Sequence, residues 1–123
     1  RLEPPEGDPL RLMAPGWHAH LNQGKESVVC DLKADPALGV ALCRRADVVL
    51  ANIISDVLCI YADNLVDSVS PGGVLALSGI LAKEQDAVRA HFEAKCQAAW
   101  GAGTRADGRI MGEWSDVALF RPL

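Results

Sequence analysis

Hydrophobic residues fall into ordered runs from residue 27 onward, whereas the first 27 residues show only weak periodicity. Prolines and glycines interrupt this first segment so often that we expect little regular structure before Trp17. Short apolar runs then alternate with segments of helical spacing. The pattern predicts an irregular N-terminal segment over residues 1–27 and a folded region over residues 28–123.

Several apolar runs predict strands. Residues 27–32 form a short run, residues 46–53 contain the unbroken run Val48-Val49-Leu50-Ala51, and residues 74–79 form a third. An unbroken run suits a strand covered on both faces, as in a parallel sheet. Residues 109–114 and 116–121 read as two strands of a closing hairpin.

The segments between these strands predict helices. The first helix begins at Ser55 or Asp56, either of which can cap it, and ends at Ser70-Pro71-Gly72-Gly73. Its apolar residues recur at helical spacing: Leu58, Tyr61, Ala62, Leu65 and Val69. The second helix runs from Lys83 to Trp100, with one apolar face made by Val88, Phe92, Cys96 and Ala99. This order predicts an α/β domain with a mainly parallel sheet and a C-terminal antiparallel hairpin.

Composition and charge narrow the class of protein. The chain has 123 residues, of which 50% are hydrophobic and 23% charged, as in an ordinary globular domain rather than a disordered tail. A net charge of −4 without clusters of Lys and Arg argues against a nucleic-acid surface. The most apolar stretch, residues 48–66, is too polar for a membrane span. Without a visible export signal, we expect a cytoplasmic location.

Cysteine and histidine spacing predicts no metal site. The four cysteines lie far apart in the sequence without a C-x-x-C pair, so we interpret them as buried thiols. His18 and His20 form an H-x-H pair, but no further ligand follows at the spacing that zinc requires.

Candidate functional residues lie at the carboxyl ends of the predicted strands, where ligands bind in open α/β sheets. Asn52 ends an apolar strand, and a dry core cannot satisfy all the hydrogen-bonding groups of its amide. It could instead bond its own loop or cap the next helix. Asp31 could accept a hydrogen bond from a ligand's amine or hydroxyl, or serve as a turn or cap residue. Trp114, which opens the last hairpin, is expected to be a packing residue.

Three motifs in order carry a resemblance to a known family. They are Ala51-Asn52-Ile53-Ile54, Ser70-Pro71-Gly72-Gly73 and Leu77-Ser78-Gly79-Ile80-Leu81. Together they resemble the C-terminal part of the catalytic domain of the ribosomal protein L-eleven methyltransferase family (PrmA type). The resemblance runs from about residue 46 to residue 121 and implies a Rossmann-like class I methyltransferase sheet.

The resemblance also implies chemistry. S-adenosylmethionine would be the methyl donor, and a ribosomal protein would be the substrate, methylated on lysine or amino-terminal amines. In the family, the asparagine at the position of Asn52 contributes to the donor and substrate site, so Asn52 is the candidate catalytic and cofactor-binding residue. Asp31 is a second candidate for cofactor binding, near the adenine. Pro71, Gly72 and Gly73 are treated as structural.

Parts of the family's pattern are missing from the sequence. We find neither the glycine-rich loop that holds the donor's methionine end, nor the following strand with its ribose-binding acid, nor the separate substrate-recognition domain. We therefore expect a truncated catalytic domain with a partial sheet, of doubtful cofactor binding. The alternatives are a non-catalytic α/β module that binds a partner or self-associates through uncovered sheet surface, and a methyltransferase of the same class with another substrate.

Overall fold

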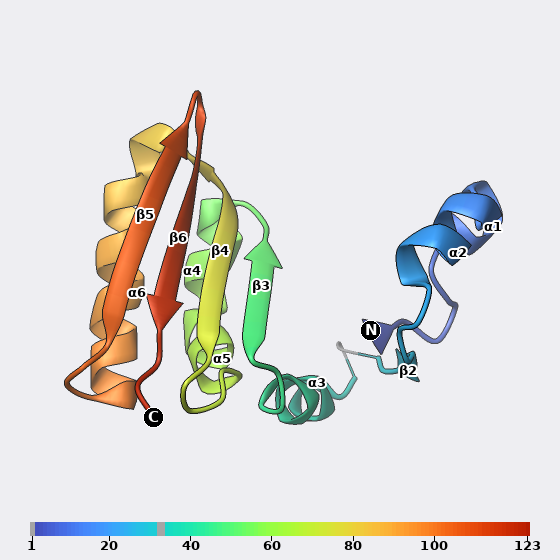
Figure 1. Ribbon diagram of the computed structural model, residues 1–123, viewed down its shortest axis with the longest axis horizontal. Helices are drawn as coiled ribbons and strands as arrows, with labels where there is room; N and C mark the ends of the chain where they lie inside the picture. The colour runs from blue at the N-terminus through green and yellow to red at the C-terminus, as the bar shows by residue number, and fades with distance from the viewer. Residues whose placement is uncertain (1, 32–33) are drawn as a thin grey trace. The chain divides into compact units, whose positions relative to one another are not determined.

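A computed structural model describes residues 2–31 and 34–123 of the chain (Figure 1). The chain divides into two compact units, residues 1–39 and 40–123, and the division falls inside helix α3 (Pro36–Cys43). The boundary predicted between residues 27 and 28 concerns where a methyltransferase domain begins. Compactness does not test that boundary, so it stays a prediction.

The first unit contains more regular structure than its proline and glycine content predicted. Helix α1 spans Leu10–Met13 and helix α2 spans Pro15–Asn22, so helical structure begins before Trp17. The reason is positional. Pro15 occupies the first turn of α2, where a missing N–H breaks no hydrogen bond. At the start of α1, the Asp8 carboxylate accepts a hydrogen bond of 2.8 Å from the Leu10 amide.

Two short strands complete this unit. Strand β1 (Leu2–Glu3) pairs in parallel with strand β2 (Val28–Val29). Strand β2 is shorter than the predicted run over residues 27–32, and Leu32 lies outside the described residues. The side chain of Glu3 is buried and forms an ion pair of 2.7 Å with Arg11.

The second unit is built on a four-stranded sheet with the order β3-β4-β6-β5. Strand β3 (Val48–Asn52) runs parallel to strand β4 (Val74–Leu81). Strands β5 (Arg105–Met111) and β6 (Trp114–Phe120) form the C-terminal hairpin, and β6 pairs antiparallel with β4. The prediction of a partial α/β sheet ending in an antiparallel hairpin is confirmed. Within this sheet β3–β4 is a parallel pair, whereas β4–β6 and β5–β6 are antiparallel pairs.

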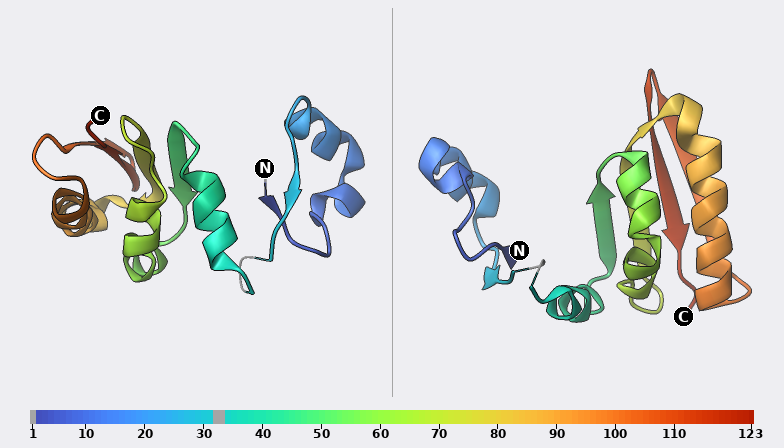
Figure 2. Two further views of the ribbon diagram at one scale, coloured as in Figure 1. Left: turned by 90° about the horizontal axis from the view of Figure 1, so that it is seen from below. Right: turned by 180° about the vertical axis from the view of Figure 1, so that it is seen from behind.

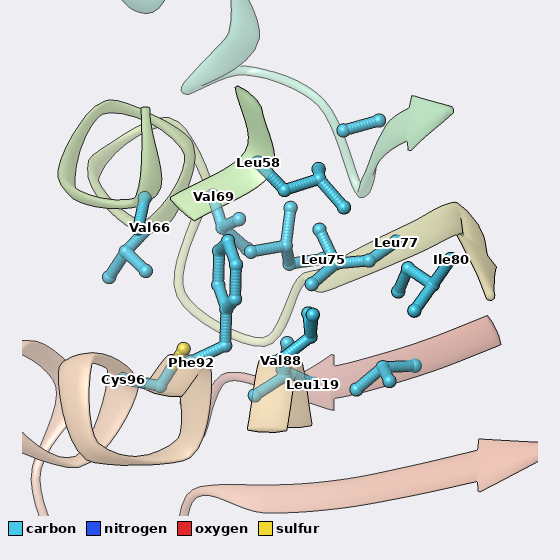
Figure 3. Close-up of a cluster of buried hydrophobic side chains, with 13 residues drawn as sticks. Leu58, Val66, Val69, Leu75, Leu77, Ile80, Val88, Phe92, Cys96 and Leu119 are labelled. Carbon is cyan, nitrogen blue, oxygen red and sulfur yellow. The ribbon is translucent and has the colours of Figure 1, made fainter. Parts of the chain in front are cut away.

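Helices α4 (Ser55–Ile60), α5 (Ala62–Asp67) and α6 (Gln85–Trp100) cover one face of this sheet (Figures 1 and 2). Between them lies the core shown in Figure 3. Its largest fully buried side chains are Phe92, Leu58, Leu75, Leu77, Ile80, Leu119, Val66, Val69, Val117 and Cys96. The predicted apolar face of the second helix is confirmed at Val88, Phe92 and Cys96, whereas Ala99 is exposed.

The single helix predicted after β3 is wrong, because the chain forms α4 and α5 with an interruption at Tyr61 (φ −98°, ψ 15°). The buried positions are Leu58, Ala62, Val66 and Val69, and the Tyr61 side chain is 54% exposed. The predicted cap is also wrong. Ser55 makes no cap, and its hydroxyl instead donates a hydrogen bond of 2.7 Å to the Glu84 carboxylate.

Strand β3 is covered on one face, whereas its apolar run predicted cover on both. Val48 and Leu50 are 57% and 67% exposed, while Ala51 is buried on the helix side. Alternation along the strand puts Val48 and Leu50 on the face opposite the helices. An apolar run shows that both faces are apolar, but it does not show what covers them.

The prediction of four buried thiols is confirmed for two of the cysteines. All four cysteines are free thiols; Cys30 and Cys96 are buried, and Cys43 and Cys59 are partly exposed. Within the described part of the chain, no helix combines the length and the apolar character needed to cross a bilayer.

Candidate functional site

The end of strand β3 lies beside the middle of the parallel strand β4, which continues to Leu81. Asn52 is opposite Ser78 in the strand register, and the Ile53 amide donates a hydrogen bond of 3.2 Å to the Ser78 carbonyl. Asn52 at the end of β3 and Ser78-Gly79 within β4 therefore lie next to each other. The Asn52 side chain is exposed rather than enclosed in its own loop.

A cleft of about 360 Å³ opens beside these residues. It is lined by Asn52, Ile53 and Ile54 after β3, by Ser78 and Gly79 in β4, and by Trp114 at the start of β6. The cleft thus combines an amide, a hydroxyl and backbone groups with apolar walls. Small-molecule and side-chain sites are typically concave and apolar with a few placed polar groups.

Gly79 brings two hydrogen-bond acceptors together in this cleft. Its φ is +80°, and β4 has a register irregularity between Leu77 and Ile80. A Cβ at position 79 would lie 2.8 Å from Asn52 Oδ1 and 3.2 Å from the Ile53 carbonyl oxygen. Both oxygens therefore lie close to the glycine, and the residues that carry them line the cleft. Two acceptors of this kind suit a donor with several N–H groups, such as an amine.

Trp114 lines the cleft, although its place in the closing hairpin predicted a packing residue. Its side chain is 55% exposed and lines the cleft beside Asn52. A signal for this was present in the alternation of β6. Ser115, Val117 and Leu119 are buried against the helices, so Trp114 has the parity of the opposite face.

A second hollow of about 280 Å³ adjoins the cleft and shares Ile54, Gly79 and Trp114 with it. Two carboxylates, Asp56 and Glu84, also line this hollow. They place negative charge in the hollow that adjoins the cleft. Such a field raises the local concentration of cationic ligands.

Asp31 follows strand β2 in the first unit and is exposed. Its carboxylate accepts a hydrogen bond of 3.2 Å from the Ala34 amide, and its carbonyl accepts one of 2.7 Å from the Asp35 amide. These are the bonds of a turn residue, which was the alternative considered for Asp31. Asp31 and Asn52 belong to different units, so their roles are separate predictions.

Comparisons with known proteins agree with the motifs. The family model described as ribosomal protein L11 methyltransferase (PrmA) matches residues 8–114. A protein named ribosomal protein L11 methyltransferase from Pelobacter propionicus is 36% identical over 107 residues, which are 87% of this chain and 31% of the relative. One of the same name from Xylella fastidiosa is 38% identical over 95 residues, covering 77% of this chain and 28% of the relative.

A protein of the same name from Pseudomonas aeruginosa is 51% identical over 51 residues, 42% of this chain and 17% of the relative. The chain therefore spans between a sixth and a third of the length of these relatives.

A solved structure shares the fold. The crystal structure of a ribosomal protein L11 methylase from Lactobacillus delbrueckii subsp. bulgaricus superposes with a TM-score of 0.62 at 19% identity, over 99% of this chain and 57% of that chain. The order of strands and helices, the motifs at the strand ends and the family match over residues 8–114 agree with one another. The chain therefore belongs to the ribosomal protein L11 methyltransferase (PrmA) family.

Proposed function

We propose that this chain carries the amine-binding side of the active site of an S-adenosylmethionine-dependent protein N-methyltransferase whose substrate is a ribosomal protein. The proposal rests on Asn52 Oδ1 and the Ile53 carbonyl oxygen, two acceptors that lie beside Gly79 on residues lining the cleft. Family membership supports the donor and the substrate class. Lysine or amino-terminal amines are the groups to be methylated.

Methyl transfer requires a neutral amine whose lone pair faces the methyl group. The donor, when bound, supplies an activated methyl group on a sulfonium. A neutral primary amine has two N–H bonds and one lone pair, so two acceptors at the strand ends can hold both hydrogens and leave the lone pair free. Asn52 Oδ1 and the Ile53 carbonyl would do this, and holding reactants in line accounts for much of the rate in such displacements.

The residues present fit the donor in part. The Asn52 amide lies at the carboxyl edge of the sheet, where the methyl end of the donor would meet the amine. Asp31 is a carboxylate that can accept hydrogen bonds from the adenine amine. The sequence contains no glycine-rich loop between a strand and a helix, because Gly101-Ala102-Gly103 follows helix α6. We therefore propose that tight donor binding needs chain that supplies this loop.

Trp114 and the adjoining carboxylates are proposed to receive the substrate's side chain. An exposed indole can pack along the methylene groups of a lysine and interact with its cationic end. Asp56 and Glu84 would attract that cation before it loses its proton. The apolar wall and the negative charge thus line two hollows that share Ile54, Gly79 and Trp114.

Calorimetric titration with S-adenosylmethionine tests this proposal. Two proteins are compared: the 123-residue chain and an extended protein, in which the upstream part of the Pelobacter propionicus relative is joined in front of it. We expect measurable binding by the extended protein and much weaker binding by the chain. Absence of binding by both proteins would remove the enzymatic interpretation.

The alternative is a non-catalytic module that self-associates through the open face of the sheet. The observation that favours it is the exposure of Val48 and Leu50 on edge strand β3. Exposed apolar sheet surface and unpaired strand edges promote association. Sedimentation equilibrium of the 123-residue chain decides between the two: a stable dimer without donor binding by the extended protein would favour this module.

A further inference from the structure

Gly79 has close neighbours at the position that a side chain would occupy, as Gly72 and Gly73 also do. A Cβ at Gly79 would lie 2.8 Å from a side-chain oxygen, that of Asn52. It would also lie 3.2 Å from the Ile53 carbonyl oxygen and 3.3 Å from the Ile53 nitrogen. Contacts below 3.0 Å do not occur for real Cβ atoms, so any other residue here forces a neighbour to move.

The neighbour most able to move is the Asn52 amide. The Ile53 backbone is fixed by its hydrogen bond of 3.2 Å to the Ser78 carbonyl, within the parallel pairing of β3 and β4. The Asn52 side chain is exposed, and no packed wall of the core holds it. Rotation about its side-chain bonds relieves the contact at little cost in packing.

We propose that Gly79 is the positioning residue of the site: its missing side chain leaves the space in which the Asn52 amide lies beside the Ile53 carbonyl. The functional consequence rests on the proposed function, because it assumes that this acceptor pair holds the substrate amine. The positioning itself does not depend on methyl transfer. It is a property of the strand ends and can be measured in the 123-residue chain.

The backbone angle of Gly79 must be separated from its contacts. At φ +80° any residue other than glycine is strained, even in open space. Gly101 provides a matched control, because its φ is +82° and nothing lies within 4 Å of the position of its Cβ. Gly79→Ala and Gly101→Ala therefore both place an alanine at positive φ, and of the two only Gly79→Ala adds the contact with Asn52.

The experiment records the side-chain amide resonances of Asn52 by ¹H–¹⁵N NMR in the wild type and both variants, with urea unfolding as the measure of stability. We expect both variants to lose stability to a similar extent, and the Asn52 resonances to shift in Gly79→Ala alone. Asn52 resonances that stay in place in folded Gly79→Ala, or that move equally in Gly101→Ala, would overturn the proposal.

If Gly79→Ala does not fold, the wild-type protein decides the question through nuclear Overhauser effects between the Asn52 side-chain amide protons and the Gly79 Hα protons. Their presence supports the proposal, and their absence overturns it. Failure of methyl transfer in the extended protein would leave these NMR results standing. If the Asn52 resonances do not shift in Gly79→Ala while the extended protein transfers methyl groups, the positioning role of Gly79 is excluded and the proposed function is not.

Discussion

Asn52 is an exposed amide at the end of a strand whose other residues are apolar. Its position follows from the sequence, because the end of an apolar run before a helical segment is the carboxyl end of a parallel strand. Its neighbours do not follow from the sequence. Gly79 lies where the register of β4 against β6 becomes irregular, and no local sequence pattern shows that irregularity.

At this scale, removing the Asn52 amide should impair methyl transfer. We expect Asn52→Ala to lower kcat of the extended protein at least tenfold, which corresponds to about 1.4 kcal/mol of transition-state stabilisation. The matched control is Asn64→Ala, which removes an exposed amide from helix α5. Equal kcat values for the two variants would exclude Asn52 from the site.

Cys96 gives a prediction about pH. Burial raises the pKa of its thiol from the ordinary value of 9.0 to about 12. The unfolded chain releases this proton near pH 9, whereas the folded chain keeps it, so stability falls as the pH rises from 9 towards 12.

The free energy of unfolding, measured by urea denaturation at pH 8 and pH 10, should therefore fall more in the wild type than in Cys96→Ala. Parallel losses in the two proteins would show that the Cys96 thiol does not contribute to this pH dependence.

At the scale of the elements, periodicity predicted β3, β4 and the second helix well, because buried positions recur along them. It misplaced the strands of the hairpin, predicted over residues 109–114 and 116–121, because β5 spans Arg105–Met111 and β6 spans Trp114–Phe120. It could not predict the interruption at Tyr61, since the residues on either side of it keep helical spacing. It also could not predict that Ser55 bonds Glu84, 29 residues away, instead of capping its own helix. Contacts between distant elements decide such details.

The core between helix α6 and the sheet predicts a difference between two apolar residues. Phe92 is 0% exposed in the core, whereas Ile60 at the end of α4 is 74% exposed. Phe92→Ala should lower the free energy of unfolding by about 3–5 kcal/mol, because it leaves a cavity. Ile60→Ala should change it by less than about 0.5 kcal/mol. Urea denaturation with a common m-value measures both, and a loss of similar size in the two variants would contradict the described packing.

The open face of β3 gives a prediction about association. Leu50→Lys places a charge on a side chain that is 67% exposed, so it should leave folding intact and weaken any dimer formed through this face. Ile60→Lys is the control on the helix-covered side of the unit. Sedimentation velocity over a range of concentrations should show less association for Leu50→Lys than for Ile60→Lys. The same dissociation constant for both variants would exclude this face as the contact.

At the scale of the whole molecule, the α/β class, the closing hairpin and the family could be recognised from residues 46–121, because three motifs at strand ends occur in a fixed order. The helices of the first unit could not, because Pro and Gly both end and begin helices. The cleft contains residues from three separated segments, which pair only in the folded sheet. Trp114 lies in the cleft because β6 pairs with β4 in the folded sheet.

Transfer of a labelled methyl group to ribosomal protein L11 tests whether this chain provides the amine-binding side of a protein methyltransferase. The extended protein and the 123-residue chain are each incubated with S-adenosylmethionine and purified substrate, and the labelled amines are located by mass spectrometry. We expect methylated lysine or amino-terminal amines with the extended protein. Its Asn52→Ala variant should give at least tenfold less product. An extended protein that binds the donor but transfers no methyl group, or whose Asn52→Ala variant is equally active, would contradict the proposed function.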